Sequence, residues 1–145
     1  MNINIIALGR LKEDYYKQLS AEYEKRLSAY CKLNIIEITP VKTTNALEKE
    51  AVLIKQKLPP KSYKVALCPE GTRLTSAAFA EKISGLSDIS FIIGSSEGLS
   101  EEIKNCADLR LSLSDMTFPH RLARIMLLEQ LYRAFSIQNN KKYHK

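Results

Sequence analysis

Apolar residues recur along the chain with two different periods. Five short runs rich in isoleucine and leucine predict buried strands, and the segments after these runs have the roughly 3.6-residue period of a helix. A strand followed by a helix, repeated five times, predicts an α/β fold: a single domain with one parallel-type sheet covered by helices on both faces. The predicted strands cover residues 2–8, 33–38, 64–68, 89–93 and 109–113.

Turn and capping residues place the helices between these strands. The first helix is predicted over residues 13–30, and Thr43 or Thr44 is predicted to cap the second, over 45–58. The second helix has a thin apolar stripe, which indicates an exposed position at an edge of the sheet. The other helices are predicted to begin at Thr75 or Ser76, at Ser100, and at Pro119 as first helical residue, the last one ending near residue 137.

The last predicted helix has more apolar residues than one buried face needs. Between Leu122 and Phe135, apolar side chains cover more than half of its circumference. A helix that lies on a sheet requires a single apolar stripe. The excess favours a homodimer in which the second face contacts a partner chain, and a helix at the centre of the monomer is the alternative.

Length and composition bound the class of protein. The 145 residues, 45% of them hydrophobic, suit one domain over residues 1–145 and are too few for two. No apolar run reaches the roughly 18–20 residues that a membrane span requires. Residues 1–8 lack the charged region and the cleavage site of a signal peptide. We therefore expect a soluble cytoplasmic protein.

Charge is distributed unevenly along the chain. There are 22 Lys and Arg residues against 16 Asp and Glu, which gives a net charge of +6. Residues 116–145 contain six basic residues and one acidic residue, whereas residues 76–115 contain three and seven. A basic excess at one end favours a polyanionic partner, usually nucleic acid, although a solvated helix face would have the same composition.

Several kinds of site are disfavoured by the residues present. The three cysteines are widely spaced without a CxxC pair, and two histidines are too few for a cluster, so no metal site is expected. The chain also lacks GxGxxG, GxxxxGK[ST] and GxSxG motifs. A Rossmann dinucleotide enzyme, a P-loop NTPase and an α/β-hydrolase are therefore disfavoured.

Three predicted strand exits contain small and polar residues suited to a ligand. They are residues 68–73, residues 94–98 with a glycine at each end, and residues 114–119. In doubly wound sheets, ligands bind beyond the carboxyl ends of the strands, so we expect these segments to lie at a binding site. Each segment on its own is also compatible with a simple turn.

The last thirty residues contain two further candidate binding segments. Residues 119–124 begin the last helix, where free N–H groups and His120 favour an anion unless the side chains simply face water. The terminal Tyr143, His144 and Lys145 combine an aromatic surface, a titratable ring and a cation. This mixture suits single-stranded RNA, and a frayed C-terminus is the alternative.

Three stretches of this chain form a recognisable set. They read LSLSDMTFPH over residues 111–120, LLEQLYRAF over 127–135 and YHK over 143–145. Together they resemble the bacterial RlmH family, which belongs to the SPOUT class of methyltransferases. The similarity covers essentially the whole chain, including the segment 92–100.

The resemblance implies a fold, a cofactor and an activity. The fold would contain a C-terminal trefoil knot, and the cofactor would be S-adenosylmethionine. The activity would be methylation of N3 of a pseudouridine in 23S ribosomal RNA of the large subunit, by a homodimer acting on the assembled ribosome. By motif match, the cofactor-binding residues would be Leu67, Gly94, Leu113, Ser114, Asp115, Met116, Thr117 and Phe118.

The resemblance also implies roles at the C-terminal end. Two positions depart from the family pattern, since Ser95 stands where a second glycine is common and Cys68 where aspartate is frequent. No general base is assigned, and His120 and Arg133 are the candidate catalytic residues. The expected substrate-binding residues are Arg133, Tyr143, His144 and Lys145.

Two other functions are compatible with parts of the sequence. A non-catalytic, ribosome-associated RNA-binding module would share the charge pattern and need no cofactor. A small nucleotide-binding enzyme could use residues 94–98 as a phosphate loop, but the lysine and hydroxyl residue of a P-loop are missing there.

Overall fold

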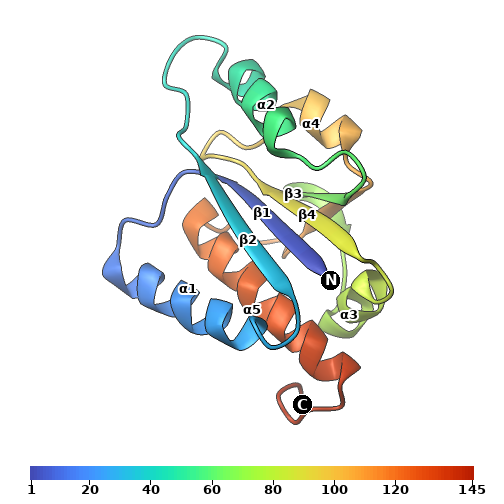
Figure 1. The fold of residues 1–145 in the computed structure, drawn as a ribbon. Coiled ribbons are helices and arrows are strands. Elements are labelled where there is room, and N and C mark those ends of the chain that lie inside the picture. The colour runs from blue at the N-terminus through green and yellow to red at the C-terminus, as the bar shows by residue number, and fades with distance from the viewer.

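The computed structural model describes residues 1–145 as five strands and five helices in strict alternation (Figure 1). The predicted α/β class and all five predicted strands are confirmed. No helix is both long enough and apolar enough to cross a membrane. The strands are β1 (Asn2–Leu8), β2 (Lys32–Ile38), β3 (Tyr63–Arg73), β4 (Asp88–Ile93) and β5 (Leu109–Ser112). The helices are α1 (Asp14–Leu27), α2 (Ala46–Lys57), α3 (Ser76–Ile83), α4 (Glu101–Cys106) and α5 (His120–Gln138).

The strands form one parallel sheet in the order β2-β1-β4-β3-β5. Connections toward the β2 edge pass through α1 and α3, whereas connections toward the β5 edge pass through α2 and α4. Because these two pairs of helices lie on opposite faces, all four crossovers have the same hand. The parallel arrangement brings the carboxyl ends of all five strands to one edge of the sheet.

Alternating side chains of the strands build a core on each face of the sheet. In β1, Ile3 and Ile5 point into the larger core with α1, α3 and α5, and Ile6 and Leu8 point into the smaller core with α2 and α4. The helix α5 lies between α1 and α3 across the centre of the larger face (Figure 1). The sheet is therefore covered on both faces, as predicted.

The apolar residues of α5 find most of their partners within the chain. Leu127, Leu128, Leu131 and Ala134 are fully buried. They belong to the larger core, where α5 faces the sheet and has α1 and α3 on its two sides. The excess of apolar residues in this helix is thus largely explained by its central position, which was the alternative to a dimer interface.

Four predicted details of the helices differ from the structure. The helix α2 covers a face of the sheet rather than an edge, because Ala51 and Ile54 are buried in the smaller core. Its first turn follows Asn45, which has a left-handed φ of 60° and makes no capping bond with its side chain, so neither threonine is the cap. Pro119 precedes α5 instead of being its first residue, and α1 ends at Leu27.

Two predicted caps are confirmed. The hydroxyl of Thr75 accepts a hydrogen bond from the N–H of Ala78 at 3.0 Å, and the hydroxyl of Ser100 accepts one from Ile103 at 3.3 Å. Each bond joins the residue before the helix to its third residue, as in an N-cap. These caps set the start of α3 and α4, directly after two of the strand exits.

Strand β3 is longer than predicted because it resumes after a bulge. Leu67 and Thr72 both pair with Leu111 of β5, so residues 68–71 form the bulge. At Gly71 the bulged backbone lies against β5. A Cβ atom at this position would lie 2.7 Å from the carbonyl carbon of Arg110, which no real Cβ contact tolerates. The first of the three predicted exit segments is therefore part of the sheet edge.

This packing predicts that Gly71→Ala destabilises the protein. The added methyl group must displace the backbone of β5, and overpacking of this kind costs about 1–3 kcal/mol. Urea denaturation measures the change. The control is Ser87→Ala, at an exposed turn residue, which should change stability by less than about 0.5 kcal/mol. Equal unfolding midpoints for Gly71→Ala and wild type would contradict the close contact.

Candidate functional site

The segments that follow β3, β4 and β5 meet at the carboxyl edge of the sheet. Ala66 pairs with Ile92, so Leu67 lies next to the end of β4, immediately before Gly94. Leu67 also pairs with Leu111, two residues before Leu113. The register of the sheet therefore brings together the three segments that contain the predicted cofactor residues. Neighbouring strands here are followed by helices on opposite faces, which is where such sheets usually bind ligands.

The segment 94–98 after β4 is a tight turn. The N–H of Gly98 donates to the carbonyl of Ser95 at 2.9 Å, and Gly98 has a φ of 82°. Gly94 is buried beneath this turn, and a Cβ atom on it would lie 2.5 Å from the carbonyl carbon of Gly98. A glycine is therefore required at position 94 for the turn to close as it does.

The segment 113–118 connects β5 to α5 and is ordered by local hydrogen bonds. The hydroxyl of Ser114 accepts from the N–H of Met116 at 3.0 Å, and its carbonyl accepts from the hydroxyl of Ser112 at 2.9 Å. Asp115 forms an ion pair with Arg73 of β3. Met116 is 75% exposed, an unusual position for a large apolar residue on a loop held this firmly.

A cavity of about 140 Å³ lies beside this segment, between α3 and α5. Leu113 is the single predicted cofactor residue in its wall. Phe79 and Met126 contribute apolar surface, and Ser76 and Gln130 contribute polar groups. The hydroxyl of Ser76 donates to the amide oxygen of Gln130 at 2.6 Å, which ties α3 to α5.

His120, at the start of α5, lies against the exit of β1. A Cβ atom at Gly9 would be 3.5 Å from Nε2 of His120, and the ring also lines a small pocket with Ile93. Burial lowers the pKa of His120 below its ordinary value, and the positive charge of Arg121 lowers it further. The side chain is therefore half-buried and does not simply face water.

The arginines that follow His120 are paired with carboxylates inside the chain. Arg124 is 6% exposed and donates to Glu37 of β2 at 2.7 Å, while its Nε has no partner. Arg121 lies 3.6 Å from Glu13 and donates to the carbonyl of Arg10 at 3.2 Å. Much of the positive charge at this helix start is therefore compensated within the fold.

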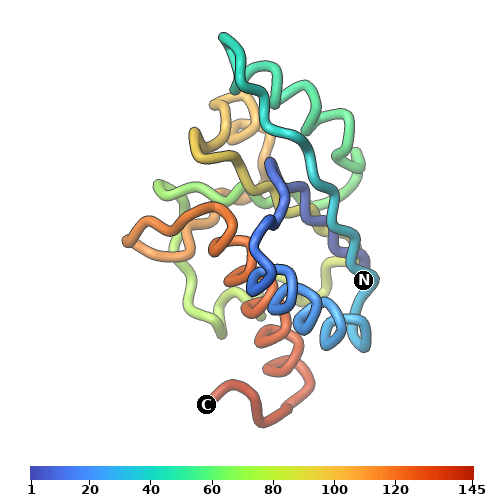
Figure 2. Tube along the Cα trace, turned by 90° about the vertical axis from the view of Figure 1, so that its left-hand side faces the viewer, coloured from blue at the N-terminus to red at the C-terminus, as the bar shows by residue number.

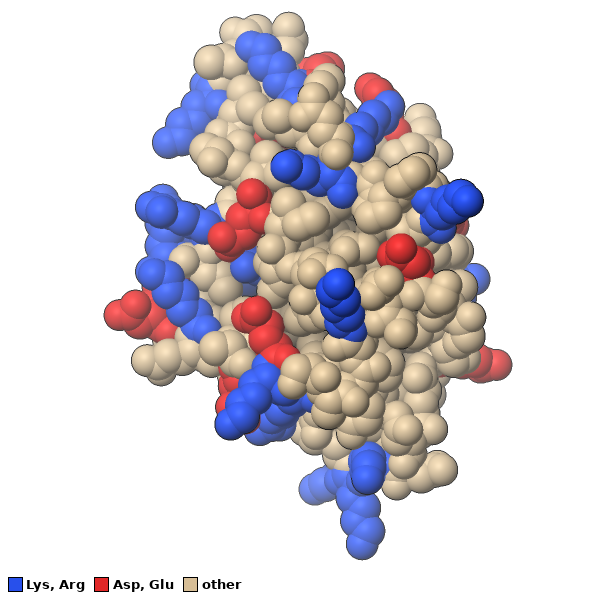
Figure 3. All heavy atoms as spheres, viewed as in Figure 1, with Lys and Arg blue, Asp and Glu red and all other residues tan.

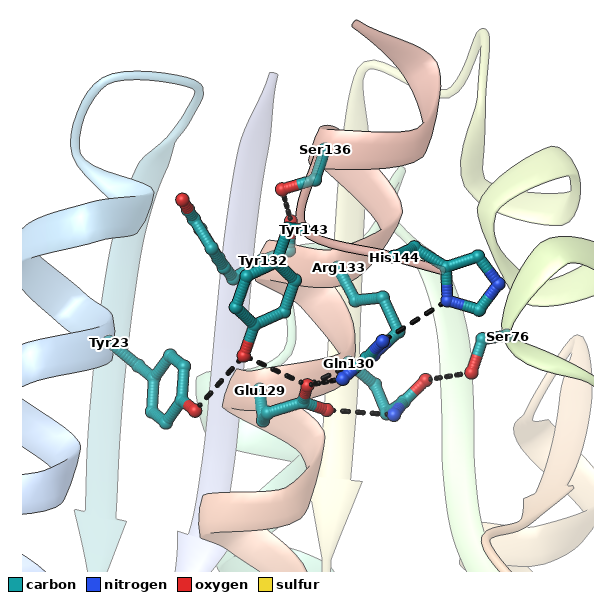
Figure 4. Close-up of polar contacts among 9 residues, drawn as sticks. All are labelled: Tyr23, Ser76, Glu129, Gln130, Tyr132, Arg133, Ser136, Tyr143 and His144. Carbon is teal, nitrogen blue, oxygen red and sulfur yellow. Dashed lines mark hydrogen bonds and ion pairs between the residues drawn. The ribbon is translucent and has the colours of Figure 1, made fainter. Parts of the chain in front are cut away.

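The C-terminal segment folds back onto α5 around Glu129 (Figure 4). One oxygen of the Glu129 carboxylate accepts from two nitrogens of Arg133, at 2.5 and 3.0 Å, and from the hydroxyl of Tyr143 at 3.1 Å. The hydroxyl of Tyr143 also contacts that of Tyr23 on α1 at 3.2 Å. His144 lies 3.1 Å from the guanidinium of Arg133.

Electrostatics keep this cluster in defined protonation states. The carboxylate of Glu129 raises the pKa of Arg133, so the guanidinium stays charged. Burial, together with the hydrogen bond to Tyr23, raises the pKa of Tyr143, so its phenol stays protonated. The Arg133 guanidinium also lies over the Tyr143 ring, 4.8 Å from its centroid.

The predicted site residues thus form two separate groups. The cofactor segments and His120 lie at the start of α5, and Arg133 with the tail residues Tyr143 and His144 lies toward its other end (Figure 2). Glu129 and Arg133 come nine and thirteen residues after His120, about 14 and 20 Å along the helix. The exposed Lys145 ends the chain at the same far end. One subunit therefore does not bring the two groups together.

Basic side chains on the face shown in Figure 3 are scattered, with acidic side chains between them. This face holds no single basic patch that would mark a nucleic-acid interface by itself. Sequence reasoning identified the tail but missed Glu129, which holds Tyr143 and Arg133 together. A signal was present, because Glu129 is the one acidic residue among residues 116–145.

The environment of His120 predicts a pH dependence of stability. Its pKa is lowered in the folded protein, so as pH falls through the ordinary histidine range the unfolded chain binds the proton first and the folded state loses stability. His120→Gln should remove up to about one proton from the stability slope between roughly pH 7.5 and 5.5. Urea denaturation across this range is the measurement, and parallel slopes for variant and wild type would contradict the assignment.

Comparison with known proteins identifies the family. A family model described as predicted SPOUT methyltransferase matches residues 1–144. The ribosomal RNA large subunit methyltransferase H 1 of Clostridium perfringens is 48% identical, and methyltransferase H proteins of Clostridium botulinum and Clostridium tetani are 47% and 46% identical; each alignment covers 100% of both chains.

A solved structure supports the fold independently. The probable methylase family protein from Haemophilus influenzae superimposes with a TM-score of 0.61 at 18% identity, over 99% of this chain and 70% of that one. A likeness at this identity concerns the fold alone. The sequence relatives and the family model show more: the chain belongs to the RlmH family of SPOUT methyltransferases, enzymes that use S-adenosylmethionine as methyl donor.

Proposed function

We propose that this protein methylates N3 of a pseudouridine in 23S ribosomal RNA of the large subunit. Its relatives are named ribosomal RNA large subunit methyltransferases, and the similarity is full length. The observation that carries the proposal is the meeting of the three cofactor segments at the carboxyl edge of the sheet, next to Leu67. The N3 position and pseudouridine come from the motif resemblance.

The residues at this edge suit S-adenosylmethionine. Leu67, Leu113 and Phe118 are half-buried apolar side chains that can pack on a purine ring, and the exposed Met116 would gain a covering partner. The backbone of Gly98 fills the volume that a side chain at position 94 would need, so a ligand at this turn would contact backbone atoms. When bound, the cofactor supplies a methyl group activated by its sulfonium.

The chain's own residues have to position the base and stabilise the charge on N3. N3 of pseudouridine is protonated, so the proton has to leave before or during attack. A fixed positive charge beside the ring favours the resulting anion. Arg133 is suited to this task because Glu129 holds its guanidinium in place and keeps it charged. Tyr143 and His144 flank it and offer surfaces for the base.

The separation of the two groups supports a homodimer with shared sites. Arg133 and the tail residues that pack around Glu129 lie roughly 14–20 Å along α5 from His120 and the cofactor segments of their own subunit. In the proposed dimer, Arg133, Tyr143, His144 and Lys145 of one subunit act at the cofactor site of the other. Each site would be incomplete in a monomer.

A trefoil knot is part of the same proposal. After β5, at the edge of the sheet, the chain returns to the centre of the larger face, where α5 lies between α1 and α3. This return passes the ends of β3 and β4, as a chain threaded through the preceding loops would. The threading would fix the segment 113–118 beside Gly94.

The assembled ribosome is the proposed substrate, in the bacterial cytoplasm. Arg121 and Arg124 are paired with Glu13 and Glu37, so fewer cations are free to bind phosphates. Binding of naked RNA depends on such contacts and weakens steeply with salt. A folded ribosomal surface would supply the missing specificity through shape.

Mass spectrometry of ribosomal RNA tests the function. A strain that lacks the protein should lose the methyl mark on a pseudouridine of 23S RNA, and wild type should restore it. Tyr143→Ala with His144→Ala should lower the methylation rate at least about tenfold, because positioning of the base is lost. An unchanged methylation pattern in the deletion strain would refute the proposal. A chain that binds RNA but not S-adenosylmethionine would favour the non-catalytic module.

Mixing two inactive variants tests the shared sites. Gly94→Ala should lose cofactor binding in calorimetry, and the Tyr143→Ala, His144→Ala variant should keep it. Ser96→Ala, at an exposed residue of the same turn, is the binding control. Mixed after dissociation in equal amounts, the two inactive variants should recover about a quarter of wild-type activity, since half of the dimers have one intact site of two. No recovery, despite proven subunit exchange, would place both groups in one subunit.

A further inference from the structure

Glu50 is a buried carboxylate without a cationic partner. It lies on the inner side of α2, next to Ala51 and one turn before Ile54, and it is 3% exposed. No lysine, arginine or histidine lies within ion-pair distance of it. Burial of a carboxylate is costly unless donors compensate it, so the two contacts that Glu50 makes have to account for its presence.

Those two contacts join separate loops at the carboxyl edge of the sheet. One oxygen of Glu50 accepts from the N–H of Val41, in the connection after β2, at 2.9 Å. The other accepts from the hydroxyl of Ser95, in the turn after β4, at 3.4 Å. Glu50 is therefore the side chain through which α2 reaches the turn of Gly94.

The contact with Ser95 continues into the turn itself. The same hydroxyl accepts a hydrogen bond from the N–H of Glu97 at 3.4 Å, and the carbonyl of Ser95 accepts from the N–H of Gly98. A chain of polar contacts thus runs from α2 into residues 95–98. Backbone contacts close the turn on itself, but Ser96 and Glu97 are exposed, so the Ser95 hydroxyl is the side-chain group that ties the turn to α2.

We propose that Glu50 is a positioning residue of the cofactor site, which holds the turn 94–98 in its binding conformation through Ser95. The proposal rests on the proposed role of this turn in binding S-adenosylmethionine. Ser95 stands where the family commonly has glycine, so the hydroxyl contact is a feature of this chain. It compensates for the lower backbone freedom of serine by fixing one conformation of the turn.

Calorimetric titration with S-adenosylmethionine tests the proposal in four variants of the full-length protein. Ser95→Ala and Glu50→Gln should each weaken affinity about three- to tenfold, as expected for loss of one hydrogen bond to a charged group. The double variant should bind S-adenosylmethionine no less tightly than the single variant with the lower affinity, because both substitutions break the same Glu50–Ser95 contact. The control is Ser96→Ala, which should bind like wild type.

A purely structural role makes a different prediction. It would lower the unfolding temperature of Glu50→Gln without changing the affinity of Ser95→Ala, and wild-type affinity in Ser95→Ala would overturn the proposal. Additive losses in the double variant would also overturn it. If Glu50→Gln does not fold, amide exchange in Ser95→Ala decides: faster exchange at Glu97 and Gly98 supports the proposal, and unchanged exchange overturns it.

The outcome for Gly94→Ala separates this proposal from the proposed function. If Gly94→Ala binds S-adenosylmethionine like wild type, the turn is not the cofactor site, so the cofactor assignment and the role of Glu50 both fail, and the deletion strain still tests the methylation itself. If Gly94→Ala loses binding while Ser95→Ala and Glu50→Gln keep it, the cofactor assignment stands and only the role of Glu50 is refuted.

Discussion

Burial of α5 against the sheet determines where His120, Arg133 and the C-terminal tail lie relative to the strand ends. Four of its side chains are completely removed from water, and the helix has α1 on one side and α3 on the other. Burial of this much apolar surface fixes both the position and the orientation of α5 on the sheet. Its start is thereby held at the carboxyl edge of the sheet, beside Gly9 and the segment 113–118. Its second half, where the C-terminal tail packs around Glu129, is held about 14–20 Å away along the helix.

Close backbone contacts fix the loops at that edge. At Gly71 and Gly94 the neighbouring backbone fills the volume that a side chain would occupy. Such contacts leave the loops little freedom to rearrange, because displacing a backbone requires moving a strand or a turn. The segment 113–118 is ordered in a similar way, by hydrogen bonds of Ser114 and by the ion pair of Asp115 with Arg73. A preorganised loop loses less entropy when a ligand binds.

Many charged side chains of this protein pair with one another inside the fold, which the net charge of +6 does not show. The carboxylate of Glu129 gathers Arg133 and Tyr143, and Glu37 neutralises the buried Arg124. The pairing of Arg121 with Glu13 and of Arg124 with Glu37 withdraws two cations that a purely electrostatic view would assign to RNA. The charge that remains lies at the tail and on scattered lysines, which suits recognition of a shaped, preassembled surface better than attraction to any polyanion.

The sequence by itself determined the local structure and the family. Strand periods, the caps Thr75 and Ser100, and the motifs of the last thirty-five residues depend on neighbours in the chain, so they could be predicted without coordinates. Only the tertiary structure decided the order of the strands, the place of α2 over a face, and the return of β3 after its bulge. It also decided the pairing of Glu50 with Ser95 and of Arg124 with Glu37, which are 45 and 87 residues apart. Pairs at such separation depend on which strands become neighbours. The order of the strands is determined by burial of the apolar faces of the sheet and helices, and no local sequence pattern determines it.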